Sequence, residues 1–195
     1  MPSPKLVLAS ASPRRLDLLA QCGISPARVL PADVDETPLA REKPLDYARR
    51  ISRAKAEKIA SACPDDFVLA ADTVVICGQR ILGKAENPKQ AREFLTLMSG
   101  RRHRVTTSVS LIPPKASKKK AKHFTVTSIV KFKRLTKSEI DAYLATNDWV
   151  GKAGAYGIQG PAGAFITFMS GSYTTIVGLP LYETVKALTD AGYGQ

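Results

Sequence analysis

The sequence predicts an α/β fold in which a mixed, twisted sheet is flanked by helices and has a central cleft. Helical and strand patterns alternate along the whole chain, without an internal repeat or a clear linker. Hydrophobic residues make up 44% of the sequence, which is enough for a substantial core. The length of 195 residues suits one domain, 1–195, with room for two lobes around the cleft.

The first predicted elements are a strand and the helix that follows it. An apolar run over Leu6–Ala9 stops at small polar residues, and a helical pattern begins at Leu16 and ends at Cys22. Ser12 can cap this helix, and Pro13 suits its first position, where no backbone N–H is needed.

The start of this helix is a candidate phosphate site. Its free N–H groups and positive dipole end favour an anion, and Arg14 and Arg15 add positive charge. Neither a Walker motif nor a G-x-G-x-x-G motif is present, so a phosphate site here is of another kind. An ordinary capped helix with a solvated arginine pair explains these residues equally well.

A loop and a long helix come next. Ser25–Pro38 is loop-like or extended and contains the acidic cluster Asp33–Thr37. The spacing of apolar residues predicts a helix over Asp46–Ala62, and Lys55 lies on its core-facing stripe. A lysine there must either extend to the surface or meet an anion.

The rest of the chain continues to alternate. Apolar or alternating runs between turn residues predict strands at Phe67–Asp72, at Thr73–Ile76 and Arg80–Leu82 as a hairpin, at Val105–Ile112, at Phe124–Phe132, and at Ala164–Met169 and Thr174–Val177 as a pair. Helical spacing and cap signals predict helices at Pro88–Met98, at Thr136–Ala145, and from Pro180 to about Ala191.

Positive charge is concentrated in one segment. The formal net charge is +12, and five lysines within residues 113–122 contribute to it. Because this segment joins two predicted strands, we interpret 113–123 as a basic loop insertion. A basic nucleic-acid-binding module is an alternative that we do not favour, since the segment lacks the interleaved aromatic residues that bind single strands.

Cysteines and histidines are too few and too scattered for a disulfide framework or a zinc or histidine metal site. Cys22, Cys63 and Cys77 show no C-x-x-C spacing, and His103 and His123 are isolated. No secretory signal and no apolar run of membrane-spanning length is present. We therefore expect a cytoplasmic location and no membrane partner.

Three further features are candidates for chemistry. Asp72 and Thr73 follow a buried strand, at the edge where open α/β sheets hold their ligands, although Asp72 could simply cap a turn. Gln159 lies in the glycine-rich segment Gly151–Gly160 and carries a donor and an acceptor for a base edge; a long irregular turn is the alternative. Lys84 is either a phosphate contact or an exposed lysine.

Together these residues favour metal-assisted attack of water on a nucleotide phosphate. The chain combines cations for phosphates, carboxylates for a divalent metal and polar groups for a base. Mg²⁺ commonly uses one or two carboxylates plus substrate phosphates, so a dedicated cage of protein ligands is not required.

Several motifs occur in a fixed order between Leu6 and about Leu188. They are Leu8-Ala9-Ser10-Ala11-Ser12-Pro13-Arg14-Arg15, Val34-Asp35-Glu36-Thr37, Arg53-Ala54-Lys55-Ala56, Ala71-Asp72-Thr73-Val74-Val75, Lys152-Ala153-Gly154-Ala155-Tyr156-Gly157-Ile158-Gln159-Gly160 and Val177-Gly178-Leu179-Pro180-Leu181. In these motifs the chain closely resembles the Maf family of nucleoside triphosphate pyrophosphatases. The resemblance implies one Maf-like domain with a fold similar to that of inosine triphosphate pyrophosphatases.

The resemblance also implies an activity. Family members hydrolyse a nucleoside triphosphate between the α- and β-phosphates, need a divalent metal (Mg²⁺ or Mn²⁺), are cytoplasmic and are often homodimers. Ala71–Thr73 and Gly157–Gly160 resemble the type that acts on dTTP and UTP, and modified pyrimidine nucleotides are further expected substrates. The alternative is the type that acts on 7-methyl-GTP, whose members often carry Gln after the Asp and Glu in place of Gln159.

The resemblance and the residue chemistry assign the candidate roles. Asp72 carries over as the catalytic acid, either as general base or as ligand of the metal whose water attacks, and Glu36 is a second metal-ligand candidate. The specificity positions carry over as Arg15, Thr73 and Gln159. The residues that we expect to bind the triphosphate are Arg14, Lys55 and Lys84, with Ser10 and Ser12 near its oxygens.

Overall fold

The computed structural model describes residues 4–194, and the chain divides into two compact units. Unit 1 consists of the chain up to Asp72, residues 107–126 and the chain from Gly178 onward, and unit 2 consists of residues 73–106 and 127–177. Three long strands contribute residues to both units: β3 (Phe67–Cys77), β5 (Arg102–Ile112) and β6 (Lys122–Phe132).

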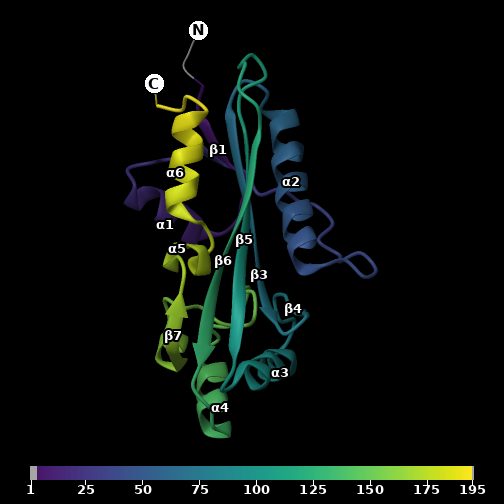
Figure 1. Ribbon diagram of the computed structural model, residues 1–195, viewed down its shortest axis with the longest axis vertical. Coiled ribbons are helices and arrows are strands. Elements are labelled where there is room, and N and C mark those ends of the chain that lie inside the picture. Colours follow the sequence, from purple (N-terminus) through teal and green to yellow (C-terminus); the bar gives the residue numbers. More distant parts are fainter. Residues whose placement is uncertain (1–3, 195) are drawn as a thin grey trace. The chain divides into compact units, whose positions relative to one another are not determined.

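The strands of the described chain form one mixed sheet. Its order is β2-β1-β3-β5-β6-β7, and β4 pairs with β3 (Figure 1). The four shorter strands are β1 (Leu6–Leu8), β2 (Arg28–Val29), β4 (Arg80–Leu82) and β7 (Ile166–Ser170). Parallel and antiparallel pairs both occur, so the predicted α/β class with a mixed sheet is confirmed.

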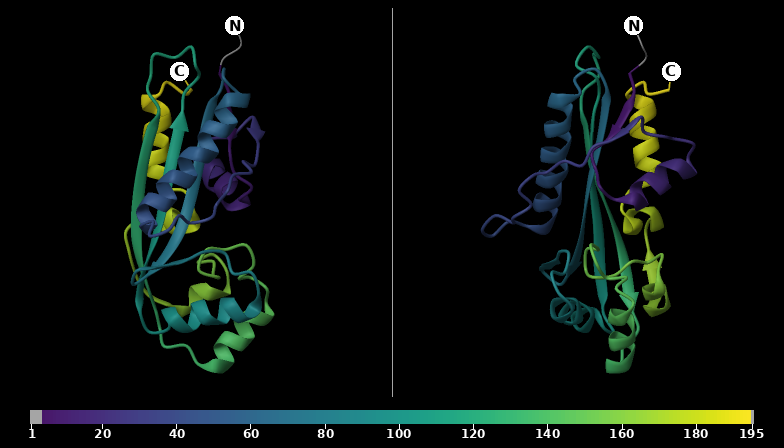
Figure 2. Two further views of the ribbon diagram at one scale, coloured as in Figure 1. Left: turned by 90° about the vertical axis from the view of Figure 1, so that its right-hand side faces the viewer. Right: turned by 180° about the vertical axis from the view of Figure 1, so that it is seen from behind.

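In unit 1, helices cover both faces of the sheet. The helix α2 (Pro44–Ala62) lies on one face, and α1 (Pro13–Gln21) and α6 (Leu181–Asp190) lie on the other (Figures 1 and 2). Because both faces are covered, β1 is buried at every position, and β3 is buried over Phe67–Asp72. Residues of α2 pack against β1 and β3 in a core that includes Val7, Ala9, Ala56, Val68 and Ala70.

The strand β3 is longer than predicted. Its first part pairs in parallel with β1, with Leu6 opposite Phe67 and Leu8 opposite Leu69, and its last part pairs antiparallel with β4. The prediction that Asp72 ends a strand is therefore wrong, because hydrogen bonding to β4 continues β3 to Cys77. The parallel pairing of β3 with β1 ends at Leu69, and Asp72 lies beyond it. Asp72 is therefore still located past the carboxyl end of β1, which is the edge where open α/β sheets hold their ligands.

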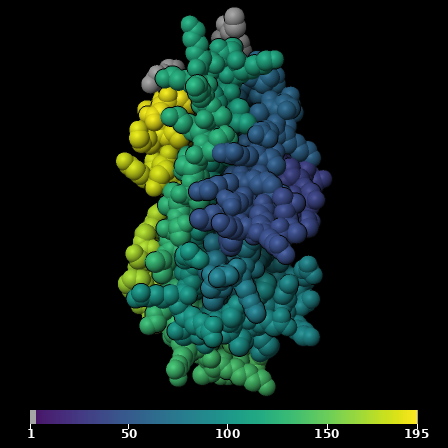
Figure 3. Space-filling model, turned by 45° about the vertical axis from the view of Figure 1, so that its right-hand side comes forward, coloured from purple at the N-terminus to yellow at the C-terminus, as the bar shows by residue number. Residues whose placement is uncertain are grey.

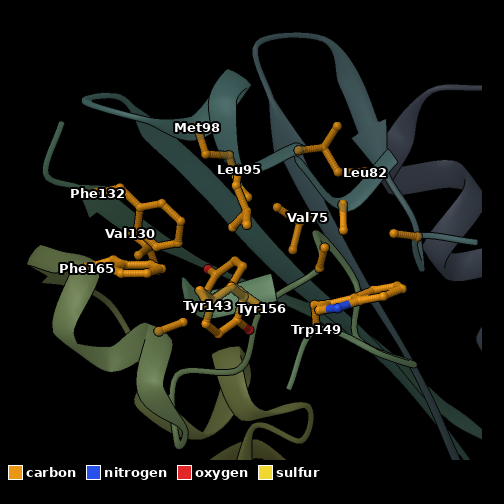
Figure 4. Packing of buried hydrophobic residues seen from close by; sticks show 14 of the residues in the cluster. Val75, Leu82, Leu95, Met98, Val130, Phe132, Tyr143, Trp149, Tyr156 and Phe165 are labelled. Atoms are coloured by element: carbon orange, nitrogen blue, oxygen red, sulfur yellow. The ribbon is translucent and has the colours of Figure 1, made fainter. Parts of the chain in front are cut away.

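In unit 2, helices and loops enclose an aromatic core. The helices are α3 (Pro88–Met98), α4 (Lys137–Ala145), α5 (Tyr173–Val177) and the 3₁₀ helix η1 (Pro161–Phe165). Phe132 is fully buried, and its ring meets the Tyr156 ring edge-to-face at a centroid distance of 4.9 Å (Figure 4). His103 lies in the same core within hydrogen-bond distance of the Tyr156 hydroxyl, and burial lowers its pKa to about 4. We therefore interpret His103 as a neutral packing residue.

The prediction of a strand at Thr174–Val177, paired with the strand at Ala164–Met169, is wrong. Thr174–Val177 is not a strand but lies in α5, although its β-branched residues favour a strand. Ser172 opens this helix, because its hydroxyl accepts a hydrogen bond from the Thr175 N–H at 3.3 Å, and Thr175 and Val177 are buried. The partner of β7 is instead β6, with Val130 opposite Met169.

The sequence predicts no membrane-spanning segment, and the helices of the structure can be compared with this prediction. In the part of the chain that the structure describes, no helix has both the length and the apolar composition needed to cross a bilayer.

Candidate active site

The candidate site in unit 1 is organised around a buried lysine between two carboxylates. The Lys55 Nζ atom lies 2.9 Å from Asp72 Oδ1 and 2.7 Å from Glu36 Oε1. Lys55 and Asp72 are 9% and 7% exposed, respectively, whereas the Glu36 side chain is 40% exposed. Of the two environments predicted for Lys55, the structure therefore gives it the anionic one.

The helix α2 positions this lysine. Tyr47, Ile51 and Lys55 are spaced four residues apart and are all buried, so they form one stripe of the helix that faces the core. Tyr47 also holds the acidic loop, because its hydroxyl donates a hydrogen bond to the Glu36 carbonyl at 2.9 Å. Burial, together with the negative charges of Asp72 and Glu36, raises the pKa of Tyr47 to about 12. Tyr47 is not among the residues predicted from the sequence, although its spacing of eight residues from Lys55 on the same helix could have indicated it.

Further contacts fasten the acidic loop to α2. Arg50 donates to the Thr37 carbonyl at 3.1 Å and forms an ion pair with Glu42 at 2.7 Å. The Thr37 N–H donates to Asp35 Oδ1 at 2.8 Å, which tightens the turn after Glu36. The position of Glu36 is thus fixed by contacts of its loop with α2 and by a hydrogen bond between its two neighbours, Asp35 and Thr37.

Arg15 links distant segments of unit 1 by hydrogen bonds from its side chain. Its Nη1 donates to Ser10 Oγ at 2.8 Å, and its Nε donates to the Gly178 carbonyl at 2.9 Å. The side chain is buried, and this burial lowers the pKa of Arg15, while the charge of Asp72 opposes the shift. Gly178 is a second residue that the sequence analysis missed as a partner, because nothing local links it to Arg15.

The N-terminus of α1 differs in detail from the prediction. Ser12 occupies the N-cap position, but its side chain makes no capping hydrogen bond; instead its N–H donates to Ser10 Oγ at 3.2 Å. Pro13 is the first helical residue, as predicted. Arg14 is half-buried and forms no ion pair with any residue of the described chain. Its guanidinium is therefore available to an anion.

The remaining candidates belong to unit 2. Thr73 follows Asp72 on β3 and is half-buried. Lys84 is exposed and pairs with Ala153 in an antiparallel bridge, which brings it beside the glycine-rich segment. Gly154 makes this approach possible: it has φ +68°, and a Cβ there would lie 2.9 Å from Val75 Cγ2. Gln159 is exposed in the same segment.

A divalent metal is compatible with the two carboxylates. Residues 4–194 contain no group of three or more His, Cys, Asp and Glu side chains arranged for a metal ion. Glu36 and Asp72 nevertheless converge on one cationic atom, the Lys55 ammonium nitrogen. Because Mg²⁺ takes one or two protein carboxylates together with substrate phosphates, this pair fits a hard divalent cation whose coordination the substrate completes.

Known proteins resemble this chain over nearly its whole length. The family model described as Maf-like protein matches residues 5–191. The dTTP/UTP pyrophosphatase of Caulobacter vibrioides is 55% identical over 190 residues, which is 97% of both chains. The dTTP/UTP pyrophosphatase of Agrobacterium fabrum is 52% identical over 195 residues, covering 97% of this chain and 93% of the relative.

Among solved structures, a HAM1 protein from Coxiella burnetii matches 96% of this chain and 99% of its own chain. The TM-score is 0.48 at 15% sequence identity. The expected likeness to inosine triphosphate pyrophosphatases stays a prediction.

Proposed function

The chain belongs to the Maf family, and we propose on this basis that it hydrolyses dTTP and UTP to the nucleoside monophosphate and pyrophosphate. The observation that carries the substrate assignment is 55% identity, over 97% of both chains, to a dTTP/UTP pyrophosphatase. The cluster of Glu36 with the buried Lys55 and Asp72 supports the reaction type, because it supplies the carboxylates that a water-activating site needs.

In the proposed reaction, water attacks the α-phosphorus, the α–β anhydride bond breaks and pyrophosphate leaves. Asp72 acts on the attacking water, either by accepting its proton or by binding the metal that acidifies it. Glu36 is the second carboxylate that would hold a divalent cation. When bound, Mg²⁺ or Mn²⁺ would neutralise phosphoryl charge and lower the pKa of bound water.

Cations at two places are proposed to bind the triphosphate. Arg14, at the N-terminus of α1, combines a free guanidinium with the positive end of the helix dipole, and Ser12 precedes it. Lys84 is exposed and suited to a further phosphate contact. Arg15 donates a hydrogen bond to Ser10, so we assign both residues to shaping the loop before α1. In addition, Arg15 stays a candidate for substrate selection, and Ser10 stays a candidate for contact with the triphosphate oxygens.

One assay tests this function directly. The purified chain is incubated with Mg²⁺ or Mn²⁺ and with dTTP, UTP, dCTP, dATP, dGTP or 7-methyl-GTP, and pyrophosphate release is measured. We expect the highest kcat/KM for dTTP and UTP, and no release after EDTA is added. Faster hydrolysis of 7-methyl-GTP would replace the substrate assignment.

Size-exclusion chromatography with light scattering tests the proposed homodimer, and cell fractionation tests the proposed cytoplasmic location.

Gln159 is proposed to read the base. Its amide offers one donor and one acceptor face, whereas a carboxylate only accepts. We expect Gln159→Glu to lower kcat/KM for dTTP and UTP by about 10- to 100-fold, roughly the loss of one or two hydrogen bonds, and to affect purine nucleotides less. Steady-state kinetics over the same panel provide the measurement.

The matched control is Gln79→Glu, which makes the same change in the exposed turn between β3 and β4. It should leave all rates unchanged. An equal loss for every base in Gln159→Glu would reject base reading by this residue.

A further inference from the structure

The basic loop between β5 and β6 has no part in the proposed reaction. Lys118, Lys119 and Lys120 of this loop and Lys122, the first residue of β6, line a hollow of about 670 Å³ together with Thr189 and Asp190 of α6, all within unit 1. Figure 3 shows the side chains of this loop, in teal to green, extending outward from the surface. The structure therefore brings four lysines to the lining of one hollow.

Charge in this hollow is not balanced by the protein. Its only acidic lining residue, Asp190, is already paired with Lys186 at 3.2 Å. None of the four lysines that line the hollow forms an ion pair within the described chain. Four neighbouring positive charges without protein partners favour a polyanion over a single small anion.

We propose that this loop binds the phosphate backbone of double-stranded nucleic acid, without regard to sequence. Residues 113–123 contain no Phe, Tyr or Trp side chain, and His123 at their end is the one aromatic ring, so the segment lacks the several stacking rings that single-strand binding needs. They also contain no large apolar side chain, such as Leu, Ile or Phe, that could enter a lipid surface. A duplex carries one phosphate charge per ~1.7 Å of helix axis and is the densest match for clustered lysines.

The test compares two variants with equal loss of charge. In the first, Lys118, Lys119, Lys120 and Lys122 are replaced by serine; in the control, four exposed and dispersed lysines, Lys43, Lys89, Lys131 and Lys137, are replaced by serine. Binding of a labelled 20-base-pair duplex is measured by fluorescence anisotropy at several salt concentrations. In wild type we expect log Kd to rise with log salt concentration with a slope of roughly 3 to 4, the value for three to four neutralised phosphates.

The expected result is that the loop variant loses at least tenfold in duplex affinity and most of the salt slope, while the control variant keeps wild-type binding. Equal losses in both variants would mean that net charge alone attracts the duplex, which would overturn the proposal. Tighter binding to anionic phosphatidylserine vesicles than to the duplex would also overturn it. Pyrophosphate release should be unchanged in the loop variant, because the loop is outside the proposed reaction.

A second inference has an independent origin, the Lys55 ammonium group. It occupies the point on which Glu36 and Asp72 both converge, at 2.7 and 2.9 Å. Asp72 is buried, so removal of the lysine would leave two neighbouring carboxylates, one of them out of water, without the ammonium group that contacts both, and only the more distant charge of Arg15 would act on them. A cation is thus favoured at this point before any metal or nucleotide arrives.

We infer that Lys55 is an internal counter-ion that a divalent cation replaces when the nucleotide binds. The inference rests on the proposed function. Lys55 and a metal ion cannot both occupy the position between Asp72 Oδ1 and Glu36 Oε1, so Lys55 keeps the affinity of the nucleotide-free protein for metal at this position low. After the exchange, the lysine side chain is free to contact a phosphate, which reconciles its observed partners with the phosphate role predicted from the sequence.

Metal binding to the nucleotide-free protein tests this exchange. We expect Lys55→Met to bind Mn²⁺ at least tenfold more tightly than wild type in isothermal titration calorimetry. Lys58→Met, a change on the same helix at an exposed lysine that contacts the Asp33 carbonyl, should bind Mn²⁺ as wild type does. Adding Asp72→Asn to Lys55→Met should abolish the gain, since one of the two carboxylates is then lost.

A second variant at Lys55 keeps the test valid if Lys55→Met does not fold. Lys55→Gln removes the charge but keeps a neutral hydrogen-bond donor on a somewhat shorter side chain, and Mn²⁺ should raise the Tm of both Lys55 variants more than that of wild type. If neither variant gains affinity or thermal stability with Mn²⁺, the exchange is wrong, even where wild type hydrolyses dTTP normally. If wild type fails to hydrolyse any nucleotide but the variants do gain Mn²⁺ affinity, the proposed function fails and the carboxylate pair remains a cation site.

Discussion

Asp72→Asn is expected to lower kcat for dTTP and UTP by roughly a thousandfold, within the range that general bases contribute, while nucleotide binding persists. The substitution keeps the shape of the side chain but removes the charge and the proton-accepting oxygen. Both open roles of Asp72 need that charge. The positive groups proposed to hold the triphosphate, including Arg14, are unchanged in the variant.

The measurement has two parts. Pyrophosphate release gives kcat, and calorimetric titration with a non-hydrolysable α,β-methylene analogue of dTTP gives binding. Asp65→Asn, which removes an exposed carboxylate shortly before β3, is the control and should retain full activity. Turnover within tenfold of wild type in Asp72→Asn would remove this residue from the mechanism.

The two roles of Asp72 can also be separated. If Asp72 is chiefly a metal ligand, raising the Mn²⁺ concentration should restore part of the lost rate in Asp72→Asn, because Glu36 and the substrate phosphates still offer ligands. If Asp72 is chiefly the base, added metal should not restore the rate, and higher pH should do so instead, since hydroxide can replace the missing proton acceptor.

The sequence was informative about the fold where one local signal dominated. The helix α4 begins with the predicted capping box, in which Thr136 and Glu139 bond reciprocally. The C-terminal segment Thr174–Val177 shows the opposite case. Its β-branched residues favour a strand by propensity, but the Ser172 hydroxyl and the burial of Thr175 stabilise a short helix instead. Contacts of this kind are set by tertiary packing, which a short window of sequence does not contain.

The sequence was less informative about the partners within the site. The stripe on α2 indicated that Lys55 would meet either solvent or an anion, but not which one, because Glu36 and Asp72 come from a loop and a strand elsewhere in the chain. Tyr47 was predictable from the same helical spacing. The partner of Arg15, the Gly178 carbonyl, was not, since a backbone oxygen at a separation of 163 residues carries no signature in its side chain.

Arg15→Met is expected to lower the free energy of unfolding by about 2–4 kcal/mol, since each hydrogen bond from a charged donor contributes ~1.5–3 kcal/mol and removal of the buried charge offsets part of the loss. The methionine fills much of the same volume but leaves Ser10 Oγ and the Gly178 carbonyl without this donor. Urea unfolding followed by circular dichroism gives the value.

Arg14→Met is the matched control, because adjacent helical residues point about 100° apart and Arg14 makes no ion pair within the described chain. Its unfolding free energy should change by less than about 0.5 kcal/mol, as for other substitutions away from structural contacts, while KM rises for all nucleotides. If the free energy of unfolding falls equally in the two variants, the hydrogen bonds of Arg15 do not contribute the expected stability.

The nucleotide panel then decides what Arg15 contributes to function. If it acts by holding Ser10 and the start of α1 in place, kcat/KM in Arg15→Met should fall by the same factor for every nucleotide. If it selects the substrate, as the family resemblance implies, dTTP and UTP should lose more than the others. The Nε and Nη1 donors of Arg15 are already used inside the protein, by the Gly178 carbonyl and Ser10, and Arg15 is buried, so we expect the uniform loss to dominate. Arg15→Lys sharpens the comparison: it keeps the charge, but one ammonium group cannot reproduce the fixed fork that reaches both acceptors, so it should show the same uniform pattern at reduced size.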